Sequence, residues 1–262
     1  MSKKRVLVVL GGTSGERKVS FDSGRACLKA LKKLGYTTSL FDPKKKSLNL
    51  INKNKVDIIF NALHGKDGED GVAQSYFEYL KIPYTHSGVI SSHNAMNKVI
   101  SKEIFKKCGI KTPKYFTLEF NELNIKNLKR HIKKTKIKFP VVVKPVNEGS
   151  SLGVKICKNL LQLQKNAKHL YKKYPELIYE PFINGQEIQV AVINGNPLGA
   201  IELVPKRKFY DYKAKYSKAA KTKHIMPANI KKTKYKEVLK IAKRAHFALG
   251  CKGVTRSDFK FF

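Results

Sequence analysis

The sequence lacks the features of a disulfide-stabilised or zinc-binding protein. Its 262 residues contain four cysteines, at Cys27, Cys108, Cys157 and Cys251. They are far apart, and no Cys-x-x-Cys pair suggests a zinc or redox motif. The pattern favours reduced cysteines in a cytoplasmic protein.

Long apolar runs are also absent. No stretch approaches the roughly 20 consecutive apolar residues of a membrane span, and the N-terminus leads directly into a short Val and Leu run that ends in Gly-Gly. We therefore expect neither a membrane-spanning segment nor a signal peptide. With 42% hydrophobic and 28% charged residues, the composition is that of a folded protein, long enough for more than one folding unit.

Acidic residues are scarce: 19 Asp and Glu face 54 Lys and Arg, which gives a formal net charge of +35. Such an excess raises the hypothesis of nucleic-acid binding, because basic side chains that neutralise phosphates release counterions. However, only seven of the basic residues are arginine, the side chain that favours base readout and bidentate phosphate contacts. Lysines spread over the whole length favour a solvated basic surface that attracts anions, and no specific nucleic-acid partner is expected.

The first part of the chain reads as a parallel α/β domain that ends near residue 95. Residues 5–10 form an apolar strand, a glycine loop follows, and apolar residues then recur at helical spacing up to Leu34. Val56–Ile59 is a second strand candidate and leads into the glycine-rich loop 61–71. Gly11, Gly12 and Gly15 fit neither the G-x-G-x-x-G nor the P-loop pattern, so the first loop is equally a tight turn or a ligand-binding turn.

The middle of the chain combines lysines with a flexible loop. Met96, Ile100, Ile104 and Cys108 predict an amphipathic helix whose start carries Lys98, although a single lysine is usually solvated surface. Residues 141–144 and 154–157 read as two strands joined by a long Gly- and Ser-rich connection. Backbone N–H groups in such a loop, next to a lysine at the strand end, suit a phosphate.

The last part predicts an antiparallel sheet. Strand candidates at 178–183 and 187–193 precede an Asn-Gly hairpin signal and a third strand at 198–204. A Lys- and Tyr-rich loop over 206–223 follows, then a helix that stops at Gly250. In the final strand, Arg256 and Asp258 share one face, and a surface ion pair is the simplest interpretation of this pattern.

Eight segments in order resemble one family, the D-alanine-D-alanine ligases, which are ATP-grasp enzymes. They are GGTSGERKVSFDSG (11–24), NALHGKDGEDG (61–71), IPYTHSGV (82–89), the helix start at 96–98, VVVKPVNEGSSLGV (141–154), the region of Glu180 and Glu187, FYDYKAKY (209–216) and GVTRSDF (253–259). One such segment is a modest signal, but eight in sequence are highly specific.

The resemblance implies an ATP-grasp fold, mixed α/β and α+β, with a Rossmann-like N-terminal parallel α/β domain. The implied divisions are an N-terminal substrate-binding domain (1–95), a small ATP-grasp lobe with the phosphate-covering loop (96–184) and a large lobe (185–262). It also implies that ATP, with Mg²⁺ or Mn²⁺, activates one D-alanine as an acylphosphate that a second D-alanine attacks. A cytoplasmic homodimer serving peptidoglycan synthesis is expected, without membrane association.

The resemblance also assigns a nucleotide site. Lys98 and Lys144 would hold ATP phosphates, Lys215 would reach the γ-phosphate, and residues 148–152 would close over them. Glu180 and Glu187 would bind the adenine and ribose side. The backbone groups assigned here are those of Glu148, Gly149, Ser150 and Ser151 in the closing loop, and of Phe182 and Ile183 in the adenine slot.

For the amino acid substrate, the resemblance implies that Glu16 receives the ammonium of the first D-alanine in a hydrogen-bonded set with Ser151 and Tyr216. Arg256 would stabilise the oxyanion of the tetrahedral intermediate, and Asp258 would bind magnesium. His64 would lie near the first substrate, or act only as a structural loop histidine.

The family pattern continues beyond the last strand with a second strand carrying a metal-binding Glu and Asn, so a chain shortened at its C-terminal end is expected. Two alternatives follow. One is a catalytically impaired remnant that binds ATP only, and the other is an ATP-grasp ligase for a different acid and amine.

Overall fold

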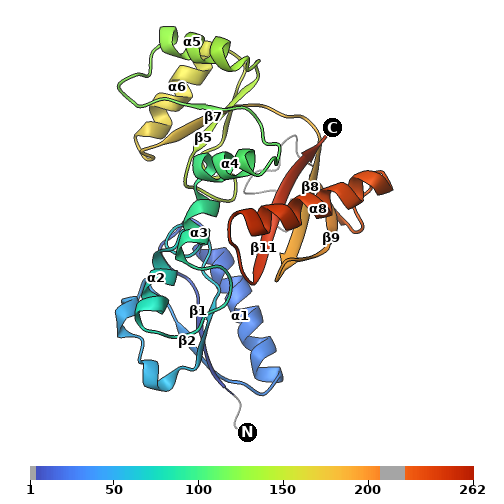
Figure 1. Ribbon diagram of the computed structural model, residues 1–262. Coiled ribbons are helices and arrows are strands. Elements are labelled where there is room, and N and C mark those ends of the chain that lie inside the picture. Colours follow the sequence, from blue (N-terminus) through green and yellow to red (C-terminus); the bar gives the residue numbers. More distant parts are fainter. Residues whose placement is uncertain (1–3, 207–221) are drawn as a thin grey trace.

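The computed structural model describes residues 4–206 and 222–262, which form three sheets with helices packed on them (Figure 1). Among these residues, no helix is long and apolar enough to cross a bilayer. Lys215 and Tyr216, two of the predicted site residues, lie outside the described residues.

The first sheet is parallel, as predicted. β1 (Arg5–Val9) lies between β2 (Thr37–Phe41) and β3 (Ile58–Asn61). β3 begins two residues later than the predicted strand at 56–59. The helical elements of this part are α1 (Arg17–Lys33), η1 (Leu48–Leu50), η2 (Lys53–Lys55), α2 (Val72–Tyr79) and α3 (Val89–Met96).

Both faces of the first sheet are covered, which explains why β1 is apolar without alternation. Leu7 and Val9 join a core cluster with Phe77 of α2, whereas Val8 packs in a second cluster that includes Leu28 of α1. The continuous apolar run therefore specifies a central strand between two helical layers.

The predicted helix over 96–108 is in part wrong, because the chain breaks at Asn97. α3 ends at Met96, Asn97 has an extended backbone, and α4 (Lys98–Lys107) begins at the next residue. The side chain of Asn97 accepts the N–H groups of Val99 and Ile100, each at 3.0 Å. This N-cap satisfies two of the unpaired donors of a helix start and makes Lys98 the first helical residue.

The second sheet is antiparallel, in the order β4-β7-β5-β6. The predicted pairing across the long loop is confirmed, since Val141 of β5 lies opposite Cys157 of β6. α5 and α6 pack on this sheet around Leu128 and Leu163, both fully buried. The elements are β4 (Phe116–Thr117), α5 (Ile125–Thr135), β5 (Val141–Pro145), β6 (Lys155–Cys157), α6 (Leu160–Tyr171) and β7 (Leu177–Pro181).

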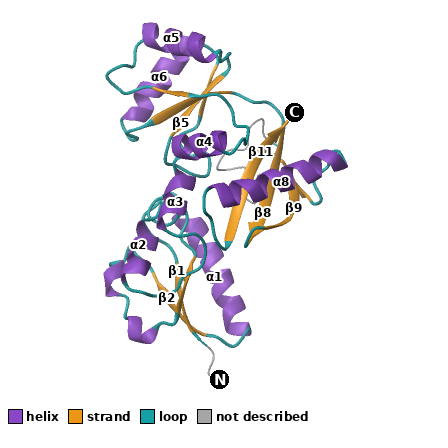
Figure 2. Cartoon of the chain, viewed as in Figure 1, coloured by secondary structure: helices purple, strands orange, loops and turns teal. Residues whose placement is uncertain are grey.

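The third sheet is also antiparallel, in the order β10-β9-β8-β11. Asn194 and Gly195 turn the β8–β9 hairpin with φ of 48° and 79°, as the Asn-Gly signal predicts. α8 lies over β8, β9 and β11 (Figure 2) and buries Val190 and Ala242 in one cluster, against which Phe259 of β11 packs. The elements are β8 (Gln186–Ile193), β9 (Asn196–Val204), β10 (Lys223–Ile225), α8 (Lys232–Ala248) and β11 (Val254–Phe261).

Polar contacts join the three parts around α3 and α4, which lie at the centre of the molecule (Figure 1). The hydroxyl of Ser91 donates to the carbonyl of Gly250 at 2.7 Å, linking the first part to the third. Arg244 of α8 donates to the carbonyl of Cys108, just after α4, at 2.5 Å.

Candidate active site

The glycine loop after β1 is held by an ion pair. Gly11 and Gly12 have φ of 84° and 72°, values that favour glycine. Asp42, at the end of β2, accepts the N–H of Gly12 at 3.1 Å and pairs with Arg17 at 2.6 Å. Arg17 also donates to the carbonyl of Gly12 at 2.5 Å, so both polar groups of this residue are fixed.

The same pair predicts a pH dependence of stability. The hydrogen bond from Arg17, with further N–H groups of Gly12 and Lys44, outweighs partial burial and lowers the pKa of Asp42 to about 2. Because an unfolded Asp titrates near 3.9, the stabilisation of about 2 kcal/mol is complete above about pH 4 and is lost as the pH falls towards about 2.

We expect Asp42→Asn to lose about 2 kcal/mol of unfolding free energy at pH 7. The difference between the variant and the unmodified chain should shrink between about pH 4 and 2. Urea unfolding from pH 2 to 7 measures both curves. Parallel curves over this range would contradict the role of the pair.

Glu16 is the centre of the predicted substrate site. It lies at the N-terminal end of α1 and is 3% exposed. A Cβ added to Gly65 or Gly149 would come within 2.7 and 2.9 Å of Glu16 Oε2, so the loops 61–71 and 148–153 both reach this carboxylate. The structure thus brings together three loops that are far apart in the sequence.

Ser150, the neighbour of the Ser151 in the predicted set, donates its hydroxyl to a carboxylate oxygen of Glu16. Ser150 and Ser151 have φ of 49° and 61°, left-handed values that arise because the loop folds back over the glycine loop. Leu152 lies next to Gly15, since a Cβ there would be 3.0 Å from its Cδ1.

His64 lies beside this set. Its Nε2 is 2.9 Å from the hydroxyl of Ser23, and its backbone carbonyl accepts from Ser14 at 2.6 Å. Its Nδ1 is 3.9 Å from Glu69, which also accepts the N–H of Gly65 at 2.8 Å. These contacts brace the loop, which suits the structural alternative, and they hold the histidine close to Glu16.

Arg256 and Asp258 face this region from β11. Arg256 donates to both carboxylate oxygens of Asp258, at 2.8 and 3.1 Å. Loss of surrounding water and the nearby Glu16 raise the pKa of the Glu69 carboxyl. The charges of His64 and Arg256 lower the same pKa. Arg256 therefore acts electrostatically on the same group as Glu16 and His64.

A second charged cluster lies where α4 meets the second sheet. Glu180 is buried and forms two ion pairs. Its Oε1 is 2.6 Å from Nζ of Lys102, and its Oε2 is 2.5 Å from Nζ of Lys144. Burial raises the pKa of Glu180, but Lys144 and Lys102 outweigh it and hold that pKa below its usual range. The carboxylate thus stays charged between two ammonium groups.

Lys98 completes this cluster. Its Nζ donates to the carbonyls of Val146 at 3.0 Å and Glu148 at 2.5 Å, which ties the helix start to the closing loop. Burial and the nearby Lys144 lower the pKa of Lys98 to about 8. Lys98 and Lys144 are therefore near one another, as an anion site requires.

The sequence motifs did not indicate a role for Lys102. It lies one helical turn after Lys98, so the i, i+4 spacing of two lysines at the start of α4 was the available signal. Its partner Glu180 is 78 residues away in the chain and on another sheet, and no local pattern links the two.

The predicted adenine and ribose residues lie around the connection from β7 to β8. Phe182 and Glu187 line a cavity of about 260 Å³ together with Glu202. Ile183 is partly buried in the same connection. Glu187 pairs with Lys260 at 2.6 Å, and the N–H of Phe182 donates to the carbonyl of Pro140 at 2.8 Å, so this N–H is already used within the protein.

The parallel α/β part, the two antiparallel sheets and the charged groups gathered between them define an ATP-grasp enzyme. Residues 40–87 match the family described as the D-ala D-ala ligase N-terminus, and residues 104–262, more than half of the chain, match the D-ala D-ala ligase C-terminus. The chain belongs to the D-alanine-D-alanine ligase family.

Individual D-alanine-D-alanine ligases are similar to this chain over almost its whole length. The chain is 53% identical over 261 residues to the D-alanine-D-alanine ligase of Pelagibacter ubique, covering 99% of this chain and 84% of that protein. It is 41% identical to that of Citrifermentans bemidjiense, covering 99% and 82%.

Solved structures of D-alanine-D-alanine ligases have a similar fold. The crystal structure of the Bacillus anthracis D-alanine-D-alanine ligase superposes with a TM-score of 0.84 at 34% identity, over 99% of this chain and 83% of that one. Its complex with ATP gives a TM-score of 0.80 at 31% identity, over 100% and 83%.

Proposed function

We propose that this chain joins two molecules of D-alanine to D-alanyl-D-alanine at the expense of ATP, releasing ADP and phosphate. The observation that carries the proposal is the 53% identity to a D-alanine-D-alanine ligase over 99% of the chain. The buried Glu16, held by Ser150 of the closing loop, supports it from the side of the site.

The chemistry explains why ATP is needed. A free carboxylate is a poor electrophile, because its leaving group would be oxide. A carboxylate oxygen of the first D-alanine attacks the γ-phosphorus, and ADP leaves. The amine of the second D-alanine then attacks the acyl carbon, and phosphate leaves with the transferred oxygen.

Each phosphate-binding role rests on a charged group of this chain. Lys98 and Lys144 would neutralise ATP phosphates and, because Lys98 also bonds to Glu148, would draw the closing loop over them. Lys215 would reach the γ-phosphate, where charge accumulates during transfer. A closed loop excludes water, which would hydrolyse the acylphosphate.

At the substrate end, Glu16 would receive the ammonium of the first D-alanine, with Ser150 holding the carboxylate in place and with Ser151 and Tyr216 completing the set. Arg256 would stabilise the oxyanion that forms at the attacked carbon. His64, braced by Ser23, would orient the first substrate.

Magnesium would enter with the phosphates of ATP. Among the described residues, no three His, Cys, Asp or Glu side chains gather at one point. Mg²⁺ commonly uses one or two carboxylates plus substrate phosphates. Asp258 provides one hard oxygen donor on that pattern, and the ion would neutralise phosphate charge there.

We further propose that the enzyme works in the cytoplasm as a homodimer and that its dipeptide enters peptidoglycan precursors. Sedimentation of the purified chain tests the dimer: a single species of twice the 29.7 kDa chain mass is expected.

The pKa of Lys98 predicts how ATP use depends on pH. Because this ammonium has a pKa of about 8, it loses its charge as the pH rises, and KM for ATP should increase about fivefold between pH 8 and 9. Lys98→Arg keeps the charge throughout this range, so its KM should stay flat. An equal rise in the arginine variant would assign the titration to another group.

A substrate panel tests the proposed specificity against other carboxylate-amine ligases. The purified chain is incubated with ATP, Mg²⁺ and D-alanine, D-serine, D-lactate or L-amino acids, and products are identified by mass spectrometry. We expect D-alanyl-D-alanine as the main product. A main product other than D-alanyl-D-alanine would overturn the proposal.

A further inference from the structure

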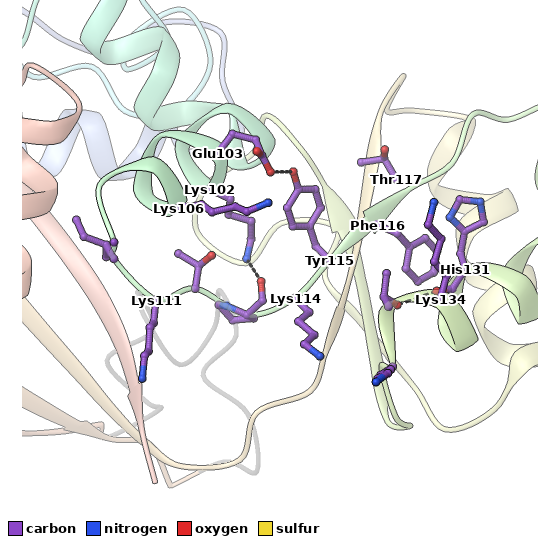
Figure 3. Close-up of a pocket in the computed structure, with 16 residues that line it drawn as sticks. Lys102, Glu103, Lys106, Lys111, Lys114, Tyr115, Phe116, Thr117, His131 and Lys134 are labelled. Carbon is purple, nitrogen blue, oxygen red and sulfur yellow. Dashed lines mark hydrogen bonds between the residues drawn. The ribbon is translucent and has the colours of Figure 1, made fainter.

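A large groove is lined by none of the residues assigned above to ATP or D-alanine, although one lining residue, Lys102, pairs with Glu180. It has a volume of about 1110 Å³ and is lined by α4, the segment 109–115, β4 and α5 (Figure 3). It shares no lining residue with the cavity beside Glu187. Its volume lies slightly above the range of roughly 300–1,000 Å³ that is typical of small-molecule pockets.

The groove is strongly basic. Six lysines line it against one carboxylate, Glu103, which accepts the hydroxyl of Tyr115 at 2.7 Å. The lysines are Lys102, Lys106, Lys111, Lys114, Lys134 and Lys136.

Five of these lysines form no ion pair among the described residues, although Lys111, after the main partner Lys234, also lowers the pKa of Glu237. Within the part of the chain that the structure describes, only Lys102 of the six forms an ion pair, with Glu180. The other five are exposed. Like charges gathered in one groove repel one another, so a multivalent anion that neutralises several of them at once would be stabilising.

The walls of the groove are fixed before any ligand binds. Lys102 donates to the carbonyl of Pro113 at 2.8 Å, and this bond and the one from Tyr115 to Glu103 appear in Figure 3. Phe116 stacks on Tyr179 with ring centroids 4.7 Å apart and planes 1° apart. His131 lies against the same ring, at 5.3 Å. A rigid floor therefore carries long, adaptable ammonium side chains.

We propose that this groove binds a polyphosphate chain, either inorganic or the triphosphate of a second nucleotide. Lysine ammonium groups bind phosphates as point charges without demanding one geometry. Several of them along an open groove match a short, flexible, densely charged anion better than a single carboxylate or phosphate. The site is additional to the ATP site and does not depend on the ligase activity proposed above.

Calorimetric titration tests the proposal on the full chain. Inorganic triphosphate is added with Mg²⁺ in excess, after the ATP site has been filled with a non-hydrolysable ATP analogue. We expect triphosphate to bind at one further site per chain, besides the filled ATP site. No additional site would overturn the proposal.

Two matched variants distinguish this groove from the general basic charge. The groove variant combines Lys111→Gln, Lys114→Gln and Lys134→Gln; the control combines Lys44→Gln, Lys45→Gln and Lys46→Gln, three exposed lysines after β2 with the same change in net charge. The groove variant should bind triphosphate about tenfold or more weakly, and the control should not change. Equally weakened triphosphate binding in both variants would show that only net charge matters and would overturn the proposed site.

The source of the phosphate chain is tested by ligands of different kinds. If the groove recognises phosphate groups, triphosphate binds far more tightly than adenosine. The affinity of ATP should then equal or exceed that of triphosphate. Adenosine binding as tightly as triphosphate would overturn the proposal. Ligase turnover should stay unchanged in both variants, so a failure of this site and a failure of the proposed function remain distinguishable.

Discussion

Glu180→Gln is expected to lower the free energy of unfolding by about 3–5 kcal/mol, the largest loss we predict for a single residue. The carboxylate is buried and its two oxygens bind Lys102 and Lys144 at 2.6 and 2.5 Å. A neutral amide leaves both ammonium groups without a counter-charge in a low-dielectric site. Removing one partner of a buried pair costs much more than the pair contributes.

Urea unfolding at neutral pH measures this loss, with Glu237→Gln as the matched control. Glu237 forms an exposed pair with Lys234, and surface pairs of this kind add little to stability. A loss below 1 kcal/mol in Glu180→Gln would show that the cluster is not the buried, mutually dependent unit described above. The double variant Lys102→Met with Glu180→Gln should recover part of the loss, since one unpaired charge is then removed.

Glu16→Gln should reduce kcat/KM for D-alanine on the order of 100-fold while KM for ATP changes little. The negative charge that would pair with the substrate ammonium is lost, whereas the phosphate-binding lysines stay in place. Steady-state kinetics with each substrate varied in turn measures both values. Circular dichroism confirms that the variant is folded.

The adjacent serines provide a comparison of their own. Because Ser150 donates to Glu16, Ser150→Ala should cost about tenfold in kcat/KM. A larger loss in Ser151→Ala than in Ser150→Ala would show that Ser151, the serine that the sequence resemblance assigned, contributes more to the site than Ser150. Similar KM values for both substrates in Glu16→Gln and the unmodified chain would remove Glu16 from the substrate site.

Local signals predicted much of the fold. The apolar run of β1, the Asn-Gly turn at Asn194 and the helix that stops at Gly250 are specified by neighbours in the sequence, and the structure contains all three. The break at Asn97 was missed because apolar periodicity continued across it, while a side-chain cap fixed the helix start.

The site was predictable only where a motif gives its residues. Glu16, Lys98 and Lys144 follow from segments that resemble the family, but the pairing of Glu180 with Lys102 depends on two sheets and a helix meeting in space. The hydrogen bond from Ser150 to Glu16 depends on a closing loop with left-handed backbone angles, which spacing does not reveal. The order β10-β9-β8-β11 likewise places the last strand beside β8, a long-range pairing that no short window contains.

The most direct test of the central claim is ADP release by the purified chain with ATP and Mg²⁺, comparing D-alanine with L-alanine and with no amino acid. The account predicts ADP release that depends on D-alanine, is absent with L-alanine, and falls sharply in Glu16→Gln. Binding of ATP without D-alanine-dependent ADP release, or equal release with L-alanine, would contradict it.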